Sequence, residues 1–296
     1  MKKLFLLFIT ILSINLTFSQ TTKVVFNNSY EFIDALGSNK IIEIAADLNI
    51  NDLDPNISGK HYRIDTGGGD RHTLVLFGLY NTEIIGQGAK PKQITNSNVF
   101  SEVLQFENCT NIKIKNIEGG HGPRKAVSCS GGVLTFFNCQ TVSILNSIMY
   151  GSGSCGITAI DVKGLKCTKS VIHGCTYEGF YLSNSSNIEF DECDIFDNDF
   201  YTLFDINNCM NITMNSCKIK NNHPAYLNDE NDLDPNCATS GYFFLFDINE
   251  SMSVTVKNCK IQNNFACFLM NKSNAATFEN TTIENNEFSF GNYFND

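Results

Sequence analysis

The 296-residue sequence has no tryptophan, five prolines and, by direct count, only three arginines: Arg63, Arg71 and Arg124. The formal net charge is −10 at pH 7. Proteins that bind nucleic acids use clusters of Arg and Lys against the phosphates, so this composition argues against a nucleic acid partner. Charged residues make up 18% and hydrophobic residues 42% of the chain. This balance argues against a long disordered acidic chain and favours a folded domain.

Beyond its first twenty residues the sequence has no apolar run long enough to span a bilayer. Residues 1–19 begin with Met-Lys-Lys, continue with an apolar run over residues 4–16 and end at Phe18-Ser19, before Gln20. A short basic start, an apolar core and small residues at the cut are typical of a secretory signal peptide. We therefore predict an exported protein, periplasmic or extracellular, in which residues 20–296 form a single domain.

An internal repeat dominates the rest of the sequence. Each copy opens with two apolar residues separated by one position, and a second such pair starts eight residues after the first. The copies open at Leu104, Leu134, Ile157, Phe180, Phe204, Phe246 and Phe268. Positions 134, 157, 180 and 204 are 23, 23 and 24 residues apart, while insertions follow the copies at 104 and 204. A regular period in this range indicates a solenoid.

Each copy contains three short segments of alternating apolar and polar residues, separated by Asn, Gly or Ser. Such segments are too short for helices and predict three strands per coil, with the apolar columns stacked inside. The sequence therefore predicts an all-β fold, a right-handed parallel β-helix. A left-handed hexapeptide coil would need a period of six, and a βα solenoid would need room for a helix. Neither alternative fits.

We expect the ends of the solenoid to be covered. An N-terminal cap over about residues 24–50 contains a short helix that starts after Asn28 and ends at Gly37, with Glu31 completing a capping box. Regular coils follow over about residues 76–285. The aromatic residues of segment 286–296 form a C-terminal cap.

Residues 108–116 (NCTNIKIKN) and their repeats resemble the right-handed parallel β-helices of the pectate-lyase-like superfamily. The resemblance covers about residues 40–290 and implies the fold. The superfamily contains polysaccharide lyases, glycoside hydrolases, epimerases, phage depolymerases and adhesins, so the fold does not choose among these functions. Neither the arginine-centred lyase motif nor the multi-aspartate polygalacturonase motif is recognisable. The leader with Phe18-Ser19-Gln20 resembles those of Bacteroidetes-type bacteria, which often export carbohydrate-active proteins.

The resemblance implies that ligands lie across the outer face of one sheet. The outward positions beside the first apolar residue of each copy are Gln105, Thr135, Thr158, Tyr181, Asp205 and Asp247. Asp205 and Asp247 fall on successive coils, about 5 Å apart. Such a pair can supply the acid and base of glycoside cleavage. We predict a catalytic site of Tyr181, Asp205 and Asp247, with His223 from the long insertion above it. The alternative is a solvated sheet face with a mobile acidic loop.

The turn over residues 118–125 is a second candidate site. His121, Arg124 and Lys125 offer a base and cations, which a β-eliminating lyase needs to abstract a proton and neutralise a uronate. The alternative is an ordinary glycine-rich turn with scattered charges.

A possible calcium site lies in a repeated hexapeptide. Residues 51–56 (NDLDPN) recur identically at 231–236, and Asp232, Asp234 and Asn236 alternate like the opening of a calcium loop. Neither copy has the glycine or the glutamate that such a loop requires next, so proline-bearing turns are the alternative. No other cofactor is indicated.

The twelve cysteines follow the repeat. Cys109, Cys139 and Cys209 occupy one column, and Cys193, Cys217 and Cys259 another. Because side chains in parallel register point the same way, we expect mainly free, buried thiols. A bridge such as Cys155–Cys175 is compatible with export.

The leading hypothesis is an exported, monomeric carbohydrate-active β-helix protein that binds or cleaves a polysaccharide or surface glycan, as a lyase or a glycoside hydrolase. The alternative is a non-catalytic binding or surface-structural β-helix. The scarcity of aromatic residues at outward strand positions favours this alternative modestly.

Overall fold

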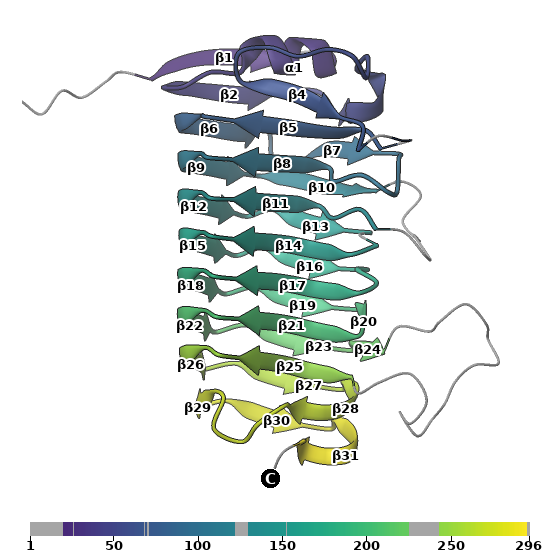
Figure 1. Cartoon of the computed structure of the whole chain (residues 1–296), viewed down its shortest axis with the longest axis vertical. Coiled ribbons are helices and arrows are strands. Elements are labelled where there is room, and N and C mark those ends of the chain that lie inside the picture. The colour runs from purple at the N-terminus through teal and green to yellow at the C-terminus, as the bar shows by residue number, and fades with distance from the viewer. Residues whose placement is uncertain are drawn as a thin grey trace, which may run out of the picture.

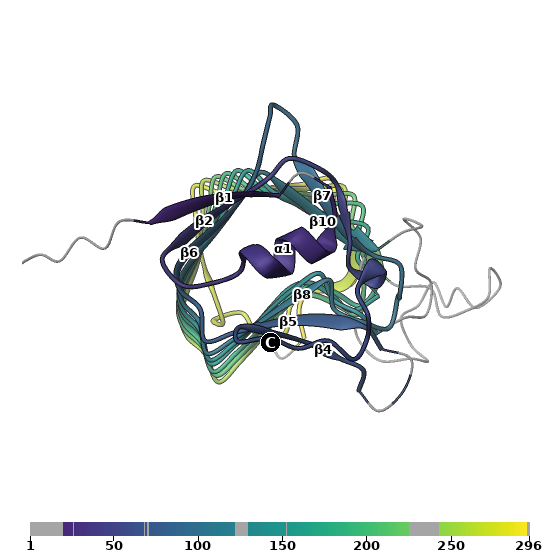
Figure 2. The same ribbon diagram turned by 90° about the horizontal axis from the view of Figure 1, so that it is seen from above.

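The structure is a computed structural model of the chain, and it describes residues 20–25, 27–67, 69, 71–121, 130–151, 153–224 and 243–294. The strands wind into a column of stacked coils with a short helix at the N-terminal end (Figure 1). Viewed along the column, the successive coils superimpose and enclose a single core (Figure 2). Each coil passes in turn through three sheets, here called A, B and C. The predicted right-handed parallel β-helix is confirmed.

Sheet A has ten strands, which lie in the order β1 (Thr21–Val25), β2 (Lys40–Ile44), β6 (Tyr80–Gly86), β9 (Thr110–Lys115), β12 (Gln140–Leu145), β15 (Lys163–Thr168), β18 (Ser186–Asp191), β22 (Met210–Asn215), β26 (Met252–Lys257) and β29 (Thr277–Glu279). Sheet B has nine strands, β3 (Leu48–Asn49), β7 (Lys92–Asn96), β10 (Ile117–His121), β13 (Ile148–Tyr150), β16 (Val171–His173), β19 (Asp194–Phe196), β23 (Lys218–Lys220), β27 (Lys260–Gln262) and β30 (Thr282–Glu284).

Sheet C has ten strands, β4 (Tyr62–Asp65), β5 (Thr73–Phe77), β8 (Leu104–Glu107), β11 (Leu134–Phe137), β14 (Cys155–Ile160), β17 (Glu178–Ser183), β21 (Thr202–Asn207), β25 (Phe244–Asn249), β28 (Phe265–Met270) and β31 (Glu287–Tyr293). A two-stranded sheet joins β20 (Asp199–Phe200) to β24 (His223–Pro224). The strand pairs of the three large sheets are parallel except β4–β5, which is antiparallel.

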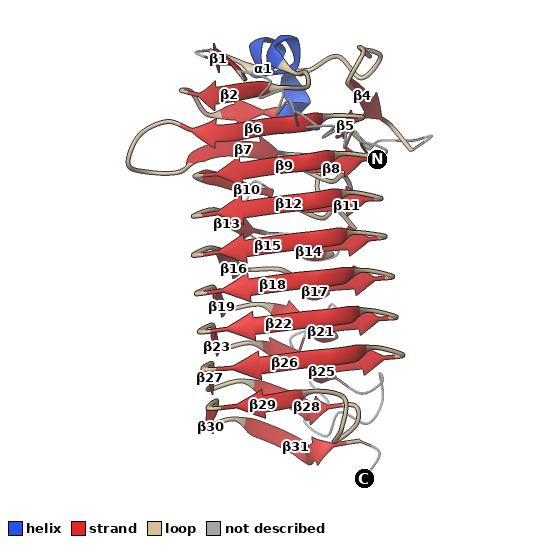
Figure 3. Ribbon diagram, turned by 90° about the vertical axis from the view of Figure 1, so that its left-hand side faces the viewer, coloured by secondary structure: helices blue, strands red, loops and turns tan. Residues whose placement is uncertain are grey.

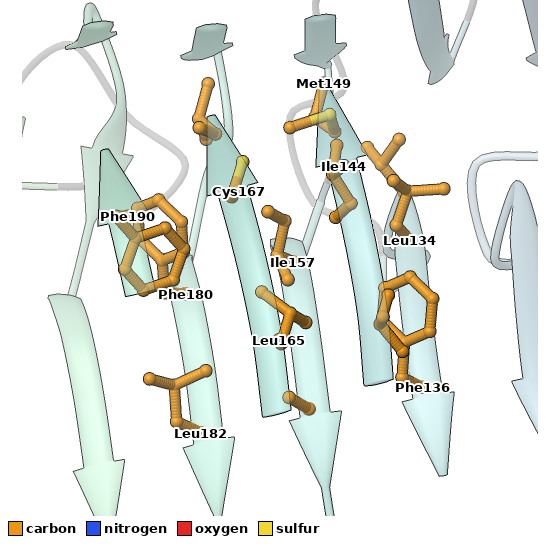
Figure 4. Close-up of a cluster of buried hydrophobic side chains, with 14 of the residues drawn as sticks. Leu134, Phe136, Ile144, Met149, Ile157, Leu165, Cys167, Phe180, Leu182 and Phe190 are labelled. Carbon is orange, nitrogen blue, oxygen red and sulfur yellow. The ribbon is translucent and has the colours of Figure 1, made fainter. Parts of the chain in front are cut away.

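The core consists of the predicted apolar columns. Leu134, Ile157, Phe180 and Phe204 pair in register on neighbouring strands and are buried (Figure 4). The rings of Phe180 and Phe204 stack with centroids 4.8 Å apart. Because no single coil can bury its apolar face, the stacking of neighbouring coils supplies the hydrophobic stabilisation.

The last coil departs from the predicted register. The repeat predicts that Phe268 lies beside Phe246, but Phe268 pairs with Phe244, and Met270 pairs with Phe246. The segment from Phe265 to Met270 is continuously apolar. Since register is specified by alternation between apolar and polar residues, a run without alternation leaves it open to a shift of two residues.

Asparagine has two structural uses in the turns. Asn108, Asn138 and Asn208 adopt positive φ, a conformation that Asn tolerates better than most residues. Inside the coil, the Nδ2 of Asn198 donates to Oδ1 of Asn222, and Asn222 repeats the contact with Asn264, each at 2.8 Å. The asparagine excess therefore serves the fold.

Helix α1 (Ser29–Ala35) covers the N-terminal end of the core, where Phe32 and Ile33 are buried. The Asn28 side chain accepts from the Glu31 amide, as predicted, but the Glu31 carboxylate bonds Asn27 instead of closing a box with Asn28. A 3-10 turn, η1 (Ile50–Asp52), follows β3. At the other end, residues expected as a cap form β31, which pairs with β28.

The cysteines of both predicted columns are buried free thiols, namely Cys109, Cys139, Cys209, Cys193, Cys217 and Cys259. The predicted Cys155–Cys175 bridge is wrong, because Cys155 instead donates its thiol hydrogen to Glu178 and Cys175 approaches the carbonyl of His173. Cys267 is disulfide-bonded.

Within the described ranges no helix is long and apolar enough to cross a membrane. The predicted signal peptide, residues 1–19, lies outside these ranges.

Candidate functional site

The outer face of sheet C presents two rows of side chains. Strict alternation would turn successive residues of a strand to opposite faces of the sheet. At the start of these strands, however, two consecutive residues such as Val103 and Leu104, or Leu203 and Phe204, are both buried in the core. The alternation therefore changes phase at the start of each strand. As a result, the residue two places before the core column faces the same side as the residue one place after it.

We call these two sets the aspartate row and the glutamate row. The aspartate row contains Gln105, Thr135, Thr158, Tyr181, Asp205 and Asp247, which pair in register. The glutamate row contains Glu102, Gly132, Cys155, Glu178, Thr202 and Phe244, of which Cys155–Glu178 and Thr202–Phe244 are register pairs. Side chains of one row contact those of the other. The Thr135 hydroxyl donates to Glu102 at 2.6 Å.

Asp205 and Asp247 are partly buried neighbours on β21 and β25. Asn207 donates to Asp205, and Asn249 donates to Asp247 at 2.9 Å, so an amide two residues along orients each carboxyl. Burial, and then the charge of Asp247, raise the pKa of Asp205 to about 6. Burial also raises the pKa of Asp247, while Asn249 and Lys272 oppose the rise. Burial thus raises the pKa of both neighbouring carboxyls.

Glu178 extends this series. The Cys155 thiol donates to Oε2 of Glu178 at 2.8 Å. Burial raises the pKa of Glu178 to about 7, with the charge of Asp205 adding to the rise and the Cys155 hydrogen bond opposing it. At near-neutral pH this face therefore holds both protonated and ionised carboxyl groups. That combination is what acid–base catalysis requires.

Glu102 lies at the far end of the glutamate row. Burial raises the pKa of its carboxyl, and hydrogen bonds from Thr135 and the Gly132 backbone, with the charge of Arg71, oppose the rise. Among the described residues, no Lys, Arg or His forms an ion pair with Glu178, Asp205 or Asp247. Within the described part of the chain, no ion pair compensates the charges of Glu178, Asp205 and Asp247.

Aromatic rings border the carboxyl groups. Tyr177 and Tyr201, which directly precede residues of the glutamate row, stack with centroids 5.2 Å apart, and Tyr201 stacks on Phe243 at 5.5 Å. Phe244 of the glutamate row stacks on Phe268 at 5.7 Å. Tyr177 and Tyr201 are partly exposed and offer apolar surface for the C–H faces of sugar rings, whereas Phe243 is buried in the core beneath them. The sequence pattern missed this border because its residues stand at strand ends rather than at outward strand positions.

His223 is not placed with the aspartates. It lies on β24, where its Nδ1 is 2.9 Å from Oδ1 of Asp199, and this hydrogen bond raises its pKa. The charges that act on His223 are those of Asp199 and Asp197. The structure brings together Tyr181, Asp205 and Asp247 of the first predicted site and leaves His223 paired elsewhere.

The second predicted site has a buried histidine. His121 is fully buried, with Nδ1 3.2 Å from the Gly151 carbonyl and Nε2 2.7 Å from the Ser101 carbonyl. Burial lowers its pKa despite these contacts. A neutral imidazole has a single N–H and donates to one of these carbonyls, and its full burial is typical of a structural residue. Arg124 and Lys125 lie outside the described residues.

The predicted calcium ligands Asp232, Asp234 and Asn236 also lie outside the described residues. In the first copy of the hexapeptide, Asp54 accepts from the Asn56 amide at 2.8 Å, which is an ordinary side-chain turn. The described part of the chain holds no group of three His, Cys, Asp or Glu arranged to bind a metal ion.

Sequence reasoning missed Glu102, Cys155 and Glu178. Strict alternation places them on the inside, two positions before a core residue. A signal was available in the paired apolar residues Val103-Leu104 and Leu203-Phe204. Two adjacent inward residues require that the residue before them faces outward.

The family described as right handed beta helix region matches residues 78–295. Among solved structures, the chain is similar to the pectate lyase Pel9A, with a TM-score of 0.52 and 11% identity over 93% of this chain and 80% of that chain. Weaker similarity links it to ORF18 of Geobacillus virus E2 (TM-score 0.41, 10% identity, 90% of this chain and 58% of that one). PfbA, a surface adhesin of Streptococcus pneumoniae, is similar at a TM-score of 0.35 and 11% identity (93% and 84%). No curated protein matches. At these identities the likeness concerns the fold alone.

Proposed function

The chain belongs to the family of right-handed β-helix proteins, and on that premise we propose that it is an exported protein that binds and hydrolyses a polysaccharide on the outer face of sheet C. The observation that carries the proposal is the pair Asp205–Asp247, two neighbouring, partly buried carboxyls whose pKa values are both raised by burial. Hydrolysis of a glycosidic bond needs one carboxyl to donate a proton and another to activate the attacking group. Tyr181, the next residue of the row, borders the same space.

Hydrolysis fits this face better than β-elimination. A lyase that acts on a uronate has to neutralise the sugar carboxylate with a cation. In the described residues the rows carry Glu102, Glu178, Asp205 and Asp247, and only Arg71 and Lys272 act on them electrostatically, at the two ends. In the sequence, the insertion of residues 225–242 between β24 and β25 contains four acidic residues and no Lys or Arg. These charges favour a glycan without uronic acids.

Export is part of the proposal. Residues 1–19 have the composition of a signal peptide, as in the Bacteroidetes-type leaders that they resemble, and residues 20–296 then form one domain. Mass spectrometry of the protein from its native host tests this directly. A mature N-terminus at Gln20 in the periplasmic or extracellular fraction is expected, and an uncleaved chain in the cytoplasm would refute it.

A glycan panel tests the activity. The wild type and the Asp205→Asn/Asp247→Asn double variant are incubated with neutral, amino-sugar and uronic-acid polysaccharides, and reducing ends and unsaturated products are measured. Reducing ends released from a non-uronate glycan by the wild type alone support the proposal. Unsaturated products would indicate a lyase, and equal activity of the double variant would remove the catalytic role from these aspartates.

The rival function is a non-catalytic glycan-binding β-helix. The stacked, partly exposed rings of Tyr177 and Tyr201 favour glycan contact whether or not a bond is cleaved. Binding of a glycan without any product in the panel would support this rival.

A further inference from the structure

We propose that Glu178 is the proton donor of this site and that the Cys155 thiol is its positioning residue. The proposal rests on the hydrolytic function proposed above and assigns the acid role within it. It follows from the hydrogen bond between two side chains on neighbouring strands of sheet C and from their place beside the aspartate row.

The geometry fixes one oxygen of Glu178. Cys155 and Glu178 are register partners on β14 and β17, and Sγ lies 2.8 Å from Oε2. Cys155 is 6% exposed, whereas Glu178 remains partly exposed on the outer face. With Oε2 engaged by the thiol, Oε1 is the oxygen left to reach a ligand. A thiol is a weak donor, so it orients the carboxyl while only modestly favouring its ionised form.

The surrounding charges support a protonated Glu178. Burial is the main cause of the raised pKa of Glu178, and the charge of Asp205 on β21 adds to the rise. The hydrogen bond from Cys155 on β14 lowers the pKa of Glu178. Glu102 acts on Cys155 from the other side, and the Cys155 thiol itself has its pKa raised by burial and by Glu178, so it stays protonated and able to donate. The pKa of Asp205 is raised to about 6 and that of Glu178 to about 7, so Asp205 ionises before Glu178.

In the proposed step, one proton leaves Glu178 and one is taken up by Asp247. The Glu178 carboxyl gives its proton to the glycosidic oxygen as the bond from that oxygen to C1 of the sugar breaks, and the oxygen keeps the bonding electron pair. A water molecule adds its oxygen to C1 and gives a proton to the ionised Asp247. Glu178 is left as a carboxylate, which accepts the Cys155 hydrogen bond more strongly than the acid does. The products are two sugar chains with free hydroxyls.

Three variants separate positioning from stability. Cys155→Ala removes the hydrogen bond that opposes the raised pKa of Glu178, so the alkaline limb of the kcat/KM profile should move up by roughly one pH unit. Cys155→Ser keeps a donor and should return the limb to its wild-type position. Cys139→Ala deletes a buried thiol whose contacts are with backbone carbonyls, and it should lower stability without moving the limb.

A measurement independent of catalysis completes the test. The δ-carbon of Glu178 is followed by ¹³C NMR as pH is varied, with Glu178→Gln assigning the signal. A midpoint near 7 that rises in Cys155→Ala and is restored in Cys155→Ser, together with the same movement of the kinetic limb, is the expected result.

The outcomes distinguish the two proposals. Glycan hydrolysis with an unmoved NMR midpoint and limb in Cys155→Ala overturns the positioning role while the hydrolytic function stands. Hydrolysis that persists at more than one-tenth of the wild-type rate in Glu178→Gln overturns the donor role. The expected NMR shifts without hydrolysis of any glycan overturn the donor role together with the hydrolytic function, and leave only the thiol–carboxyl contact.

Discussion

The outer faces of sheets A and C are built from similar parallel strands, but the carboxyls of Glu178, Asp205 and Asp247 on sheet C differ from the ion-paired acidic residues of sheet A in having no ion-pair partner among the described residues. On sheet A, which faces the viewer in Figure 3, two acidic residues have a lysine as register partner. Glu83 lies 3.2 Å from Lys113, and Glu189 lies 3.1 Å from Lys166. On sheet C, Asp205 has Asp247 as its register partner, and Glu178 has Cys155.

The difference shows that the fold does not require uncompensated carboxyls. A β-helix strand accepts a lysine beside a glutamate at the outward position, as sheet A demonstrates. Placing two carboxyls side by side raises the free energy of the folded state at neutral pH, because like charges repel and burial disfavours ionisation. Local departures of this kind are expected at functional sites. Four predictions follow from the comparison.

The largest effect concerns activity. Asp247→Asn removes the proposed base and should lower kcat/KM on the responsive glycan by about 10²–10⁴-fold, the usual range for loss of a general acid or base. Glu189→Gln on sheet A should change it less than about twofold. Kinetics at the pH optimum, with thermal unfolding to confirm folding, measure both. Equal losses on the two faces would remove the functional distinction between them.

The second prediction concerns stability against pH. The pKa of Glu178 is about 7 in the folded protein and 4.5 as its ordinary value. Between these values the folded state binds more protons than the unfolded state, so this group's contribution to stability is fully present below pH 4.5 and is lost as pH rises through 7. The loss amounts to about 3 kcal/mol.

Glu178→Gln removes that titration. Relative to wild type, the variant should therefore gain about 3 kcal/mol in its free energy of unfolding, and so in stability, as pH rises from 4.5 to 8. Urea denaturation across this pH range measures the difference. Glu189→Gln provides the matched control on sheet A and should show a change of less than about 1 kcal/mol, as expected for an exposed pair. Parallel curves for wild type and Glu178→Gln would contradict the raised pKa.

The third prediction concerns a buried partner. Thr135→Val removes the hydroxyl that donates to Glu102 at 2.6 Å and leaves that oxygen without its partner, so it should destabilise the protein by about 1–3 kcal/mol. Thr213→Val, at an outward position of β22 on sheet A, is the isosteric control and should stay within about 0.5 kcal/mol. Equal unfolding free energies for the two variants would show that Glu102 does not depend on Thr135.

The smallest effect is expected on the sheet A ion pairs. Lys166 and Glu189 are exposed at 51% and 40% of their side-chain surfaces, so Lys166→Met should alter the unfolding free energy by no more than about 0.5 kcal/mol. Raising the salt concentration should reduce even this change. A loss above about 2 kcal/mol would mean that sheet A depends on its charge pairs, contrary to the comparison.

Most of the fold was predictable because the repeat specifies both period and phase. The column from Leu104 to Phe246 has the expected register, since each copy alternates clearly between apolar and polar residues. Phe268 was misplaced because the segment around it is uniformly apolar, and hydrophobic patterning then gives no preference between registers two residues apart.

The site was only partly predictable, for a related reason. Tyr181, Asp205 and Asp247 follow from alternation after the core column. Glu178 and Cys155 depend on the change of phase before it, which alternation alone does not reveal. The contact between Cys155 and Glu178 requires the stacking distance of two coils as well as their register, and the sequence contains no motif for it.

A crystal structure of the Asp205→Asn/Asp247→Asn variant with an oligosaccharide of the responsive glycan tests the central claim most directly. We predict sugar rings along the outer face of sheet C, with a glycosidic oxygen within hydrogen-bonding distance of Glu178 and a ring against the aromatic border. An oligosaccharide bound on the outer face of sheet A or sheet B, with the carboxyls of sheet C in contact with solvent alone, would contradict the account.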